Sequence, residues 1–219
     1  MTTGHTLALD AAVSIGTVAV LRDGLVVASR EVAMRGGVEE RYMPAVLEAL
    51  REAGLGASAV DRVICGAGPG SFTSLRVAGA IAKGIAMGAE CPLFGVPSLA
   101  LVVATSTEAM APGSRWLAAL DAMRGEKYLA LVVIGEGGRL ASVAPLGLAS
   151  AEGARERGAA LEATLIGPDE SVVSVPHATG VARCLGLVTA AGPVDVASWE
   201  PVYGRLAEAQ ARREREGAM

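Results

Sequence analysis

Aromatic residues are scarce in this sequence, because phenylalanine, tryptophan and tyrosine make up only 3% of its 219 residues. A surface on which nucleic-acid bases stack against aromatic side chains is therefore not expected. Positive charge is lacking too, since 19 Lys and Arg stand against 23 Asp and Glu, for a net charge of −4. Phosphate neutralisation needs clustered Lys and Arg, so the chain is not expected to grip nucleic acid alone.

Cysteine and histidine are also few. The three cysteines, Cys65, Cys91 and Cys184, are far apart and lack metal-type spacing, which favours buried reduced thiols and a cytoplasmic protein. The two histidines, His5 and His177, stand in unrelated segments. A metal site of the His-x-x-x-His kind is therefore excluded, and we predict no metal and no metalloprotease chemistry.

Long apolar runs are missing as well. Charge-free stretches such as CPLFGVPSLALVVATST contain prolines and fall short of the roughly 20 apolar residues that span a bilayer. The first residues meet an aspartate too early to form the apolar region of a signal peptide. We expect no membrane segment.

What the chain does have is aliphatic residues in a mixed strand and helix pattern. Apolar residues make up 52% of it, enough to bury a core. TLALDAA, GTVAVL and LVVASREV predict three strands, EERYMPAVLEALREAG a helix, and DRVICGAG a short buried strand before a second helix. This order opens the ribonuclease H-like unit, which occurs twice in the actin and sugar-kinase superfamily. We therefore expect an α/β, two-lobed actin-like fold with mixed sheets flanked by helices.

The pattern changes after about residue 105. WLAALDAM and KYLALVVI resemble a β-meander that opens a second domain, after the turn-like TSTEAMAPGS. We place an N-terminal lobe at 1–107 and a C-terminal lobe at 108–219. The last segment, YGRLAEAQARREREGAM, predicts a charged helix, either solvated or packed back on the first lobe.

The stretch GAGPGSFTSLRVAGAIAKG, residues 66–84, begins as a glycine-rich loop. Its glycines would let backbone amides approach a phosphate at the start of the following helix. The loop lacks the Gly-Lys-Ser/Thr of a Walker motif and the full dinucleotide spacing, so a plain strand-to-helix turn is an equal alternative. Ser71 suits a helix cap better than a nucleophile. A weak nucleotide site would use Asp10, Gly68, Gly70 and Ser71.

The helix behind this loop is too apolar for burial on one side. From Ser74 to Ala89 its only charges are Arg76 and Lys83, seven residues apart and so on the same side. The first helix, Glu39 to Ala53, has a similar excess of apolar surface. Either the second domain covers these helices or they bind another protein. The predicted partner-binding residues are Tyr42, Met43, Val46, Leu47, Leu50, Val77, Ala78, Ile81, Ala82 and Ile85.

Five segments together resemble the TsaB (YeaZ) family: LALDAA, GAGPGSFTSLRVAGAIAKGIA, PLFGVPSLALVV, LAALDAMRGEKYLALV and EPVYGR, in that order. The resemblance implies the two-lobed actin-like fold and a role in making threonylcarbamoyladenosine in tRNA. It implies a catalytic homologue, TsaD, bound through a helical bundle of the first lobe, and TsaE, an ATPase, as a further partner. It also implies homodimers through the same surface when the chain is alone, and contact with tRNA only through the complex.

Two positions depart from that family's pattern. Many relatives have Asp-Thr where this chain has Asp10-Ala11, and His-Ser before the first helix where it has Gly36-Gly37-Val38-Glu39. The missing hydroxyl at Ala11 weakens the case for phosphate contact at the first hairpin.

We therefore expect a noncatalytic scaffold or activator subunit with no catalytic residue and no cofactor of its own. ATP or ADP at a complex interface is left open. The alternative is an independent actin-fold, ATP-dependent small-molecule kinase, in which Asp10 and Asp121 would contact a metal-bound phosphate.

Overall fold

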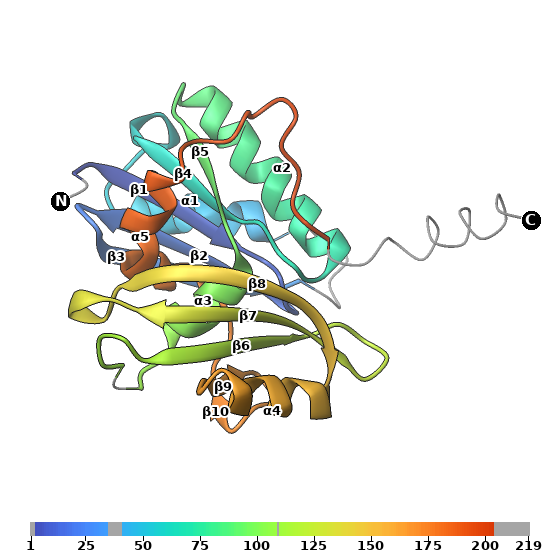
Figure 1. Cartoon of the computed structure of the whole chain (residues 1–219). Coiled ribbons are helices and arrows are strands. Elements are labelled where there is room, and N and C mark those ends of the chain that lie inside the picture. Colours follow the sequence, from blue (N-terminus) through green and yellow to red (C-terminus); the bar gives the residue numbers. More distant parts are fainter. Residues whose placement is uncertain (1–2, 35–40, 109, 204–219) are drawn as a thin grey trace, which may run out of the picture.

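The computed structural model describes residues 3–34, 41–108 and 110–203, which form two lobes, each built on a five-stranded mixed sheet (Figure 1). The first sheet has the order β3-β2-β1-β4-β5. Its first three strands are antiparallel neighbours, and β4 and β5 continue parallel to β1. The strands are β1 (His5–Asp10), β2 (Ile15–Arg22), β3 (Leu25–Ala33), β4 (Arg62–Gly66) and β5 (Leu93–Val96).

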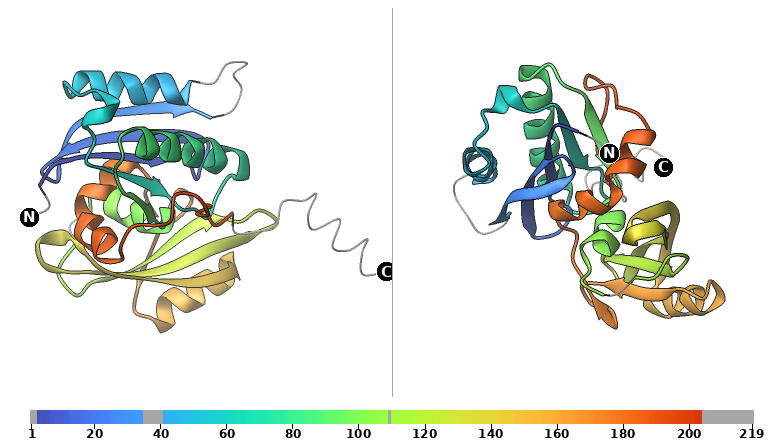
Figure 2. Two further views of the ribbon diagram at one scale, coloured as in Figure 1. Left: turned by 90° about the horizontal axis from the view of Figure 1, so that it is seen from above. Right: turned by 90° about the vertical axis from the view of Figure 1, so that its left-hand side faces the viewer.

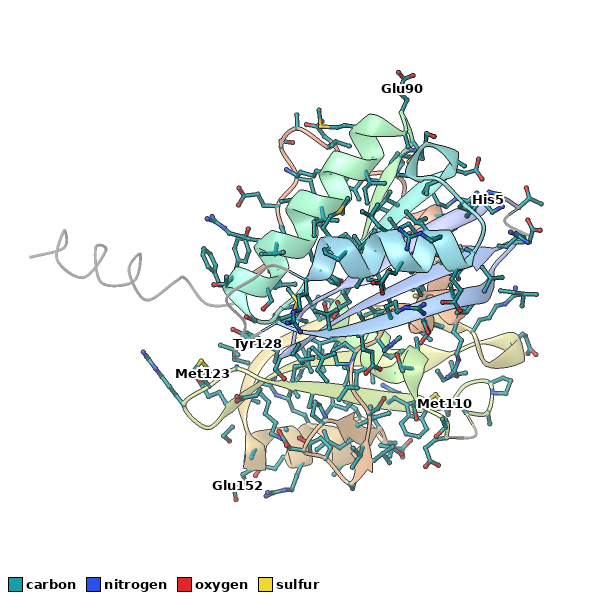
Figure 3. The ribbon with its side chains drawn as sticks, turned by 180° about the vertical axis from the view of Figure 1, so that it is seen from behind. His5, Glu90, Met110, Met123, Tyr128 and Glu152 are labelled. Atoms are coloured by element: carbon teal, nitrogen blue, oxygen red, sulfur yellow. The ribbon has the colours of Figure 1, made fainter. Side chains whose placement is uncertain are left out.

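Two helices cover the outer face of this sheet. Helix α1 (Tyr42–Glu52) packs on β3 and β2, and α2 (Phe72–Gly88) packs on β4 and β1. Figure 3 shows both helices on the near side of the molecule. The inner face is covered by α3 (Ser98–Thr105), in which every residue from Ser98 to Ala104 is buried. This helix has no polar face because it lies between the two sheets.

The second sheet has the order β10-β9-β6-β7-β8. Helix α4 (Ala151–Ala160) packs on its outer face, and α5 (Val181–Ala190) packs against α3 and β8 (Figure 2). The strands are β6 (Arg115–Asp121), β7 (Glu126–Ile134), β8 (Leu140–Ser150), β9 (Thr164–Gly167) and β10 (Val172–Val173), and the short 3₁₀ turns are η1 (Ala57–Ala59), η2 (Glu136–Gly138) and η3 (Ala178–Gly180).

Polar contacts join the lobes around η3. The Ala178 amide donates to Thr17 Oγ1 (3.0 Å), and the Ser174 hydroxyl donates to the Val102 carbonyl (2.7 Å). His177 Nε2 lies 3.3 Å from Glu31 Oε1, and burial lowers the pKa of this histidine. The junction therefore combines hydrogen bonds with the apolar core around α3.

The predicted fold is confirmed. The strand and helix order expected for the first third is the observed one, and two mixed sheets flanked by helices form the lobes. The predicted division at 107/108 falls between α3 and β6 and stays a prediction, and the predicted terminal helix lies outside the described residues. No helix within the described ranges is long and apolar enough to cross a membrane.

The tight contact of Gly70 with the first lobe yields a test. A Cβ at residue 70 would lie 2.2 Å from the Ala12 carbonyl oxygen, a backbone atom that cannot rotate away. Gly70→Ala is therefore expected to lower the free energy of unfolding by about 2 to 3 kcal/mol, measured by urea denaturation. In the control, Gly84→Ala, the new Cβ meets nothing within 4 Å and adds up to about 1 kcal/mol through helix propensity. Equal effects of the two changes would contradict this account.

Candidate functional site

The glycine-rich loop between β4 and α2 is packed against the chain's own backbone and side chains. A Cβ at Gly66 would lie 2.0 Å from Asp10 Oδ2, and one at Gly68 would lie 2.3 Å from the Val202 carbonyl oxygen. Gly70 meets the carbonyl of Ala12 in the same way. Glycine is needed at these positions because neighbouring atoms of the same chain occupy the space.

Three amides of this loop, those of Ala67, Gly68 and Ser71, already have acceptors. The Ala67 amide donates to the Val96 carbonyl (2.7 Å), and the Ser71 amide donates to the Ala12 carbonyl (2.8 Å). The Gly68 amide donates to Ser98 Oγ (3.2 Å). A phosphate-binding loop offers such amides to its ligand. This arrangement fits a strand-to-helix turn better than a phosphate cradle.

Asp10 is fully buried at the end of β1, beside this loop. Its Oδ2 accepts from the Ser98 hydroxyl (2.5 Å) and its Oδ1 from the Ala12 amide (3.1 Å). Burial raises the pKa of this carboxyl to about 6, although both hydrogen bonds act in the opposite direction. Desolvation therefore outweighs the two bonds that favour the ionised form.

The structure brings the four predicted nucleotide-site residues together. Asp10 and Gly68 both bind Ser98, while Gly70 and Ser71 both contact Ala12. Ser71 lies at the N-cap position of α2, but its side chain makes no capping bond and lies 3.0 Å from Ser74 Oγ. Nucleotide binding itself stays a prediction. In the described part of the chain, no three His, Cys, Asp or Glu residues group as a metal site.

Asp121, the second acidic residue of the kinase alternative, is exposed at the end of β6. Its Oδ1 accepts from the Met123 amide (2.9 Å) and so closes the turn between β6 and β7. This side chain has a local structural role in the hairpin.

The predicted partner-binding residues divide into two sets. Four remain at least partly accessible: Met43, Leu47, Val77 and Ile81. The other six are in the core under α1 and α2, so a partner cannot reach them without opening the lobe; they are Tyr42, Val46, Leu50, Ala78, Ala82 and Ile85. The structure thus narrows the predicted surface to the first set, and binding there stays a prediction.

Helical spacing alone predicted Tyr42 on the partner-binding surface, but its contacts hold it in the core. Its hydroxyl lies within hydrogen-bonding distance of the Thr17 carbonyl (2.7 Å) and the Asp10 carbonyl (3.0 Å). Burial is the main cause of its raised pKa, so the phenol stays protonated and can donate. Tyr42 therefore ties α1 to β1 and β2 from the inside and is not part of the outer surface.

The accessible residues lie on the facing flanks of α1 and α2. The opposite flank of α1 carries Glu48 and Glu52, whose carboxylates lie 3.8 Å and 2.5 Å from the Arg30 guanidinium of the edge strand β3. Met43 and Leu47 are therefore on the flank nearer α2.

The far flank of α2 is covered by the segment 194–203, which runs beside it in Figure 1. A Cβ at Gly79 would lie 3.4 Å from Pro201 Cγ. Val77, Ile81 and Gly84 lie at helical spacing on the other flank, toward α1. We call Met43, Leu47, Val77 and Ile81 the apolar stripe. This covering segment was not predicted from the sequence, because Pro201 lies far from α2 along the chain.

Comparisons with known proteins support the family expected from the motifs. The family model for TsaD, tRNA N6-adenosine threonylcarbamoyltransferase, matches residues 31–152, more than half of the chain. The tRNA threonylcarbamoyladenosine biosynthesis protein TsaB of Escherichia coli (strain K12) is 38% identical over 57% of this chain and 53% of its own. TsaB of Haemophilus influenzae is 36% identical over 58% and 53%. The chain belongs to the TsaD family, in its TsaB (YeaZ) branch.

A solved structure agrees with this assignment. YeaZ from Pseudomonas aeruginosa superposes with a TM-score of 0.69 and 28% identity, covering 92% of this chain and 100% of that one. The sequence matches to the curated TsaB proteins span about half of the length of those relatives. The TsaB family assignment and the two-lobed fold are thus confirmed.

The buried Asp10 carboxyl gives a pH-dependent prediction. Its pKa of about 6 in the folded state exceeds the ordinary 3.8, so the folded protein binds this proton more tightly than the unfolded chain. Its contribution to stability is therefore complete below pH 3.8 and is lost as the pH rises past 6. Asn cannot ionise. The free energy of unfolding of the wild type minus that of Asp10→Asn should fall by about 2 kcal/mol from roughly pH 4 to pH 8.

Urea denaturation of both proteins at the two pH values measures this difference. Titration of all other groups is common to the two proteins and cancels in the subtraction. A difference that does not change with pH would show that Asp10 titrates normally in the folded state.

Proposed function

We propose that this chain is a noncatalytic scaffold subunit of the machinery that makes threonylcarbamoyladenosine in tRNA, and that it binds the catalytic subunit TsaD through the apolar stripe. The observation that carries the proposal is the stripe itself, whose side chains remain at least partly accessible among the residues that the structure describes. The proposed link to threonylcarbamoyladenosine in tRNA rests on the names of the TsaB relatives.

The stripe has the chemistry of a helix-packing surface. Leu47 is 44% exposed, and Met43, Val77 and Ile81 are half-buried. Gly84 continues the same flank of α2, and a Cβ there would meet nothing within 4 Å. Apolar side chains next to a glycine allow the helices of a partner to approach closely. A helix pair of a homologous lobe fits such a surface.

The closed glycine loop supports a role without catalysis. Carbonyl oxygens of Ala12 and Val202 and the Ser98 hydroxyl lie where a phosphate would need donors and space. In this proposal the chain has no cofactor of its own, and any ATP or ADP is held at the complex interface. TsaE joins the complex, tRNA is met through the complex in the cytoplasm, and the chain alone forms homodimers through the stripe.

Ile81→Glu tests the surface. A buried carboxylate without a partner is costly, so the change is expected to weaken TsaD binding by about 100-fold or more. Light scattering and calorimetric titration of the purified chain with its cognate TsaD measure the effect. The matched control is Ala80→Glu, one position along α2 and exposed on the side away from the sheet, which should leave binding unchanged.

Three outcomes discriminate among the alternatives. Loss of binding in the folded Ile81→Glu protein alone supports the stripe. Equal binding by both variants contradicts it. If the wild-type chain does not associate with TsaD and instead phosphorylates a small molecule with ATP and magnesium, the scaffold proposal fails in favour of the kinase.

A further inference from the structure

Residues 194–203, here called the strap, cross back from the second lobe to the first and run along α2 (Figure 1). The Val194 amide donates to the Leu93 carbonyl of β5 (2.8 Å), and the Val202 amide donates to the Ala67 carbonyl of the glycine loop (2.7 Å). The strap is therefore tied near both of its ends to the lobe that carries the apolar stripe.

Two glycines of the first lobe allow the strap to pack closely against it. A Cβ at Gly79 of α2 would lie 3.4 Å from Pro201 Cγ and 3.7 Å from Trp199 Cζ3. A Cβ at Gly95 of β5 would lie 3.4 Å from Trp199 Nε1. Because these positions lack side chains, the Trp199 ring fits between the far flank of α2 and the edge of the sheet.

The last residue of the strap closes over the start of α2. The Tyr203 and Phe72 rings have centroids 4.5 Å apart. The Arg76 guanidinium lies 4.3 Å from the Phe72 centroid and 5.4 Å from that of Tyr203, and its Nε donates to the Tyr203 hydroxyl (3.3 Å). An aromatic pair and a cation over both rings each stabilise this closure.

The strap has fewer regular backbone bonds than the lobe beneath it, although Val194, Val196 and Trp199 pack against that lobe. It forms neither helix nor strand, and its turn at Asp195 is bonded within the strap, through the Ala197 amide and the Ser198 hydroxyl. The Val202 side chain is 65% exposed. Segments with few buried contacts open at lower free energy than the core.

The strap supports helix α2 from the side. The helix faces the sheet mainly with small residues, among them Ala78, Ala82 and Ala86, together with the larger Leu75 and Ile85. The strap bears on one flank of the helix, and Val77 and Ile81 of the stripe are on the other. A helix already fixed from one flank loses less freedom when a partner binds at the other.

We propose that the strap is a releasable support that holds α2 in the position recognised by its partner, so that docking of the strap and partner binding at the apolar stripe favour each other. The strap opens before the rest of the fold. The coupling to a partner rests on the proposed function, whereas the opening is a property of the chain alone.

The two tryptophans of the chain allow a direct test of the opening. Trp116 is buried in the core of the second lobe, and Trp199 is in the strap. Trp116→Phe leaves only the strap reporter, and Trp199→Phe leaves only the core reporter. In urea, Trp199 emission should shift to the red before the Trp116 signal and the helical circular dichroism change. Coincident transitions of all three signals would overturn the proposal.

Gly79→Leu tests the coupling, because the leucine side chain occupies the space of Pro201 and Trp199 while favouring the helix. In the Trp116→Phe background it should shift Trp199 emission to the red without urea, whereas the control Gly88→Leu, whose Cβ meets nothing within 4 Å, should not. With Trp116 present, Gly79→Leu should weaken TsaD binding by about tenfold although the stripe is intact.

The outcomes separate the two proposals. If the wild type binds TsaD and the released Gly79→Leu variant binds equally well, the strap inference is wrong and the stripe stands. If the wild type does not bind TsaD, the proposed function fails, and the urea transitions of the two single-tryptophan proteins still decide whether the strap opens.

Discussion

The rest of the first lobe depends on one buried hydrogen bond. The Ser98 hydroxyl donates it to the Asp10 carboxylate over 2.5 Å. Asp10 ends β1, and Ser98 begins α3. The same Ser98 oxygen accepts from the Gly68 amide of the glycine loop, and the Asp10 carbonyl lies 3.0 Å from the Tyr42 hydroxyl of α1. One buried residue, Asp10, thus connects the central strand with α3 through its carboxylate and with α1 through its backbone carbonyl, on opposite faces of the sheet.

Because of this connection, the glycine loop has a structural role. Burying the Asp10 carboxyl costs free energy. A fully buried carboxyl has lost its hydration, and its two hydrogen bonds do not compensate completely, as its raised pKa shows. Gly66 has no side chain because the carboxyl fills that space. Gly68 and Gly70 are likewise packed against the chain's own backbone, at the carbonyls of Val202 and Ala12. Among the described residues, part of the outer helical surface of the first lobe stays accessible.

The strands and helices of the first lobe could be predicted from local sequence pattern. Which residues cover each face of the helices could not. Alternation, short apolar runs and helical spacing located β1 to β4, α1 and α2, because burial on a sheet imposes those patterns. Spacing could not reveal that the Tyr42 phenol bonds inward, since that depends on carbonyls of β1 and β2. The glycine loop was ambiguous for the same reason: whether its amides are free depends on Ala12, Val96 and Ser98, which are remote in sequence.

Composition was an equally poor guide to local surfaces. Few aromatic residues exist in the chain, yet Phe72, Trp199 and Tyr203 gather along one flank of α2. Their gathering explains how a helix with too much apolar surface for one sheet stays in place: its 17 residues face the sheet, the strap and solvent in turn. The apparent excess of apolar surface thus had two causes, a covering segment from the same chain on one flank and an open stripe on the other. Among the described residues, the flank of α2 away from the strap keeps the stripe accessible. In the proposed coupling, the position of the stripe depends on how firmly the strap holds the helix.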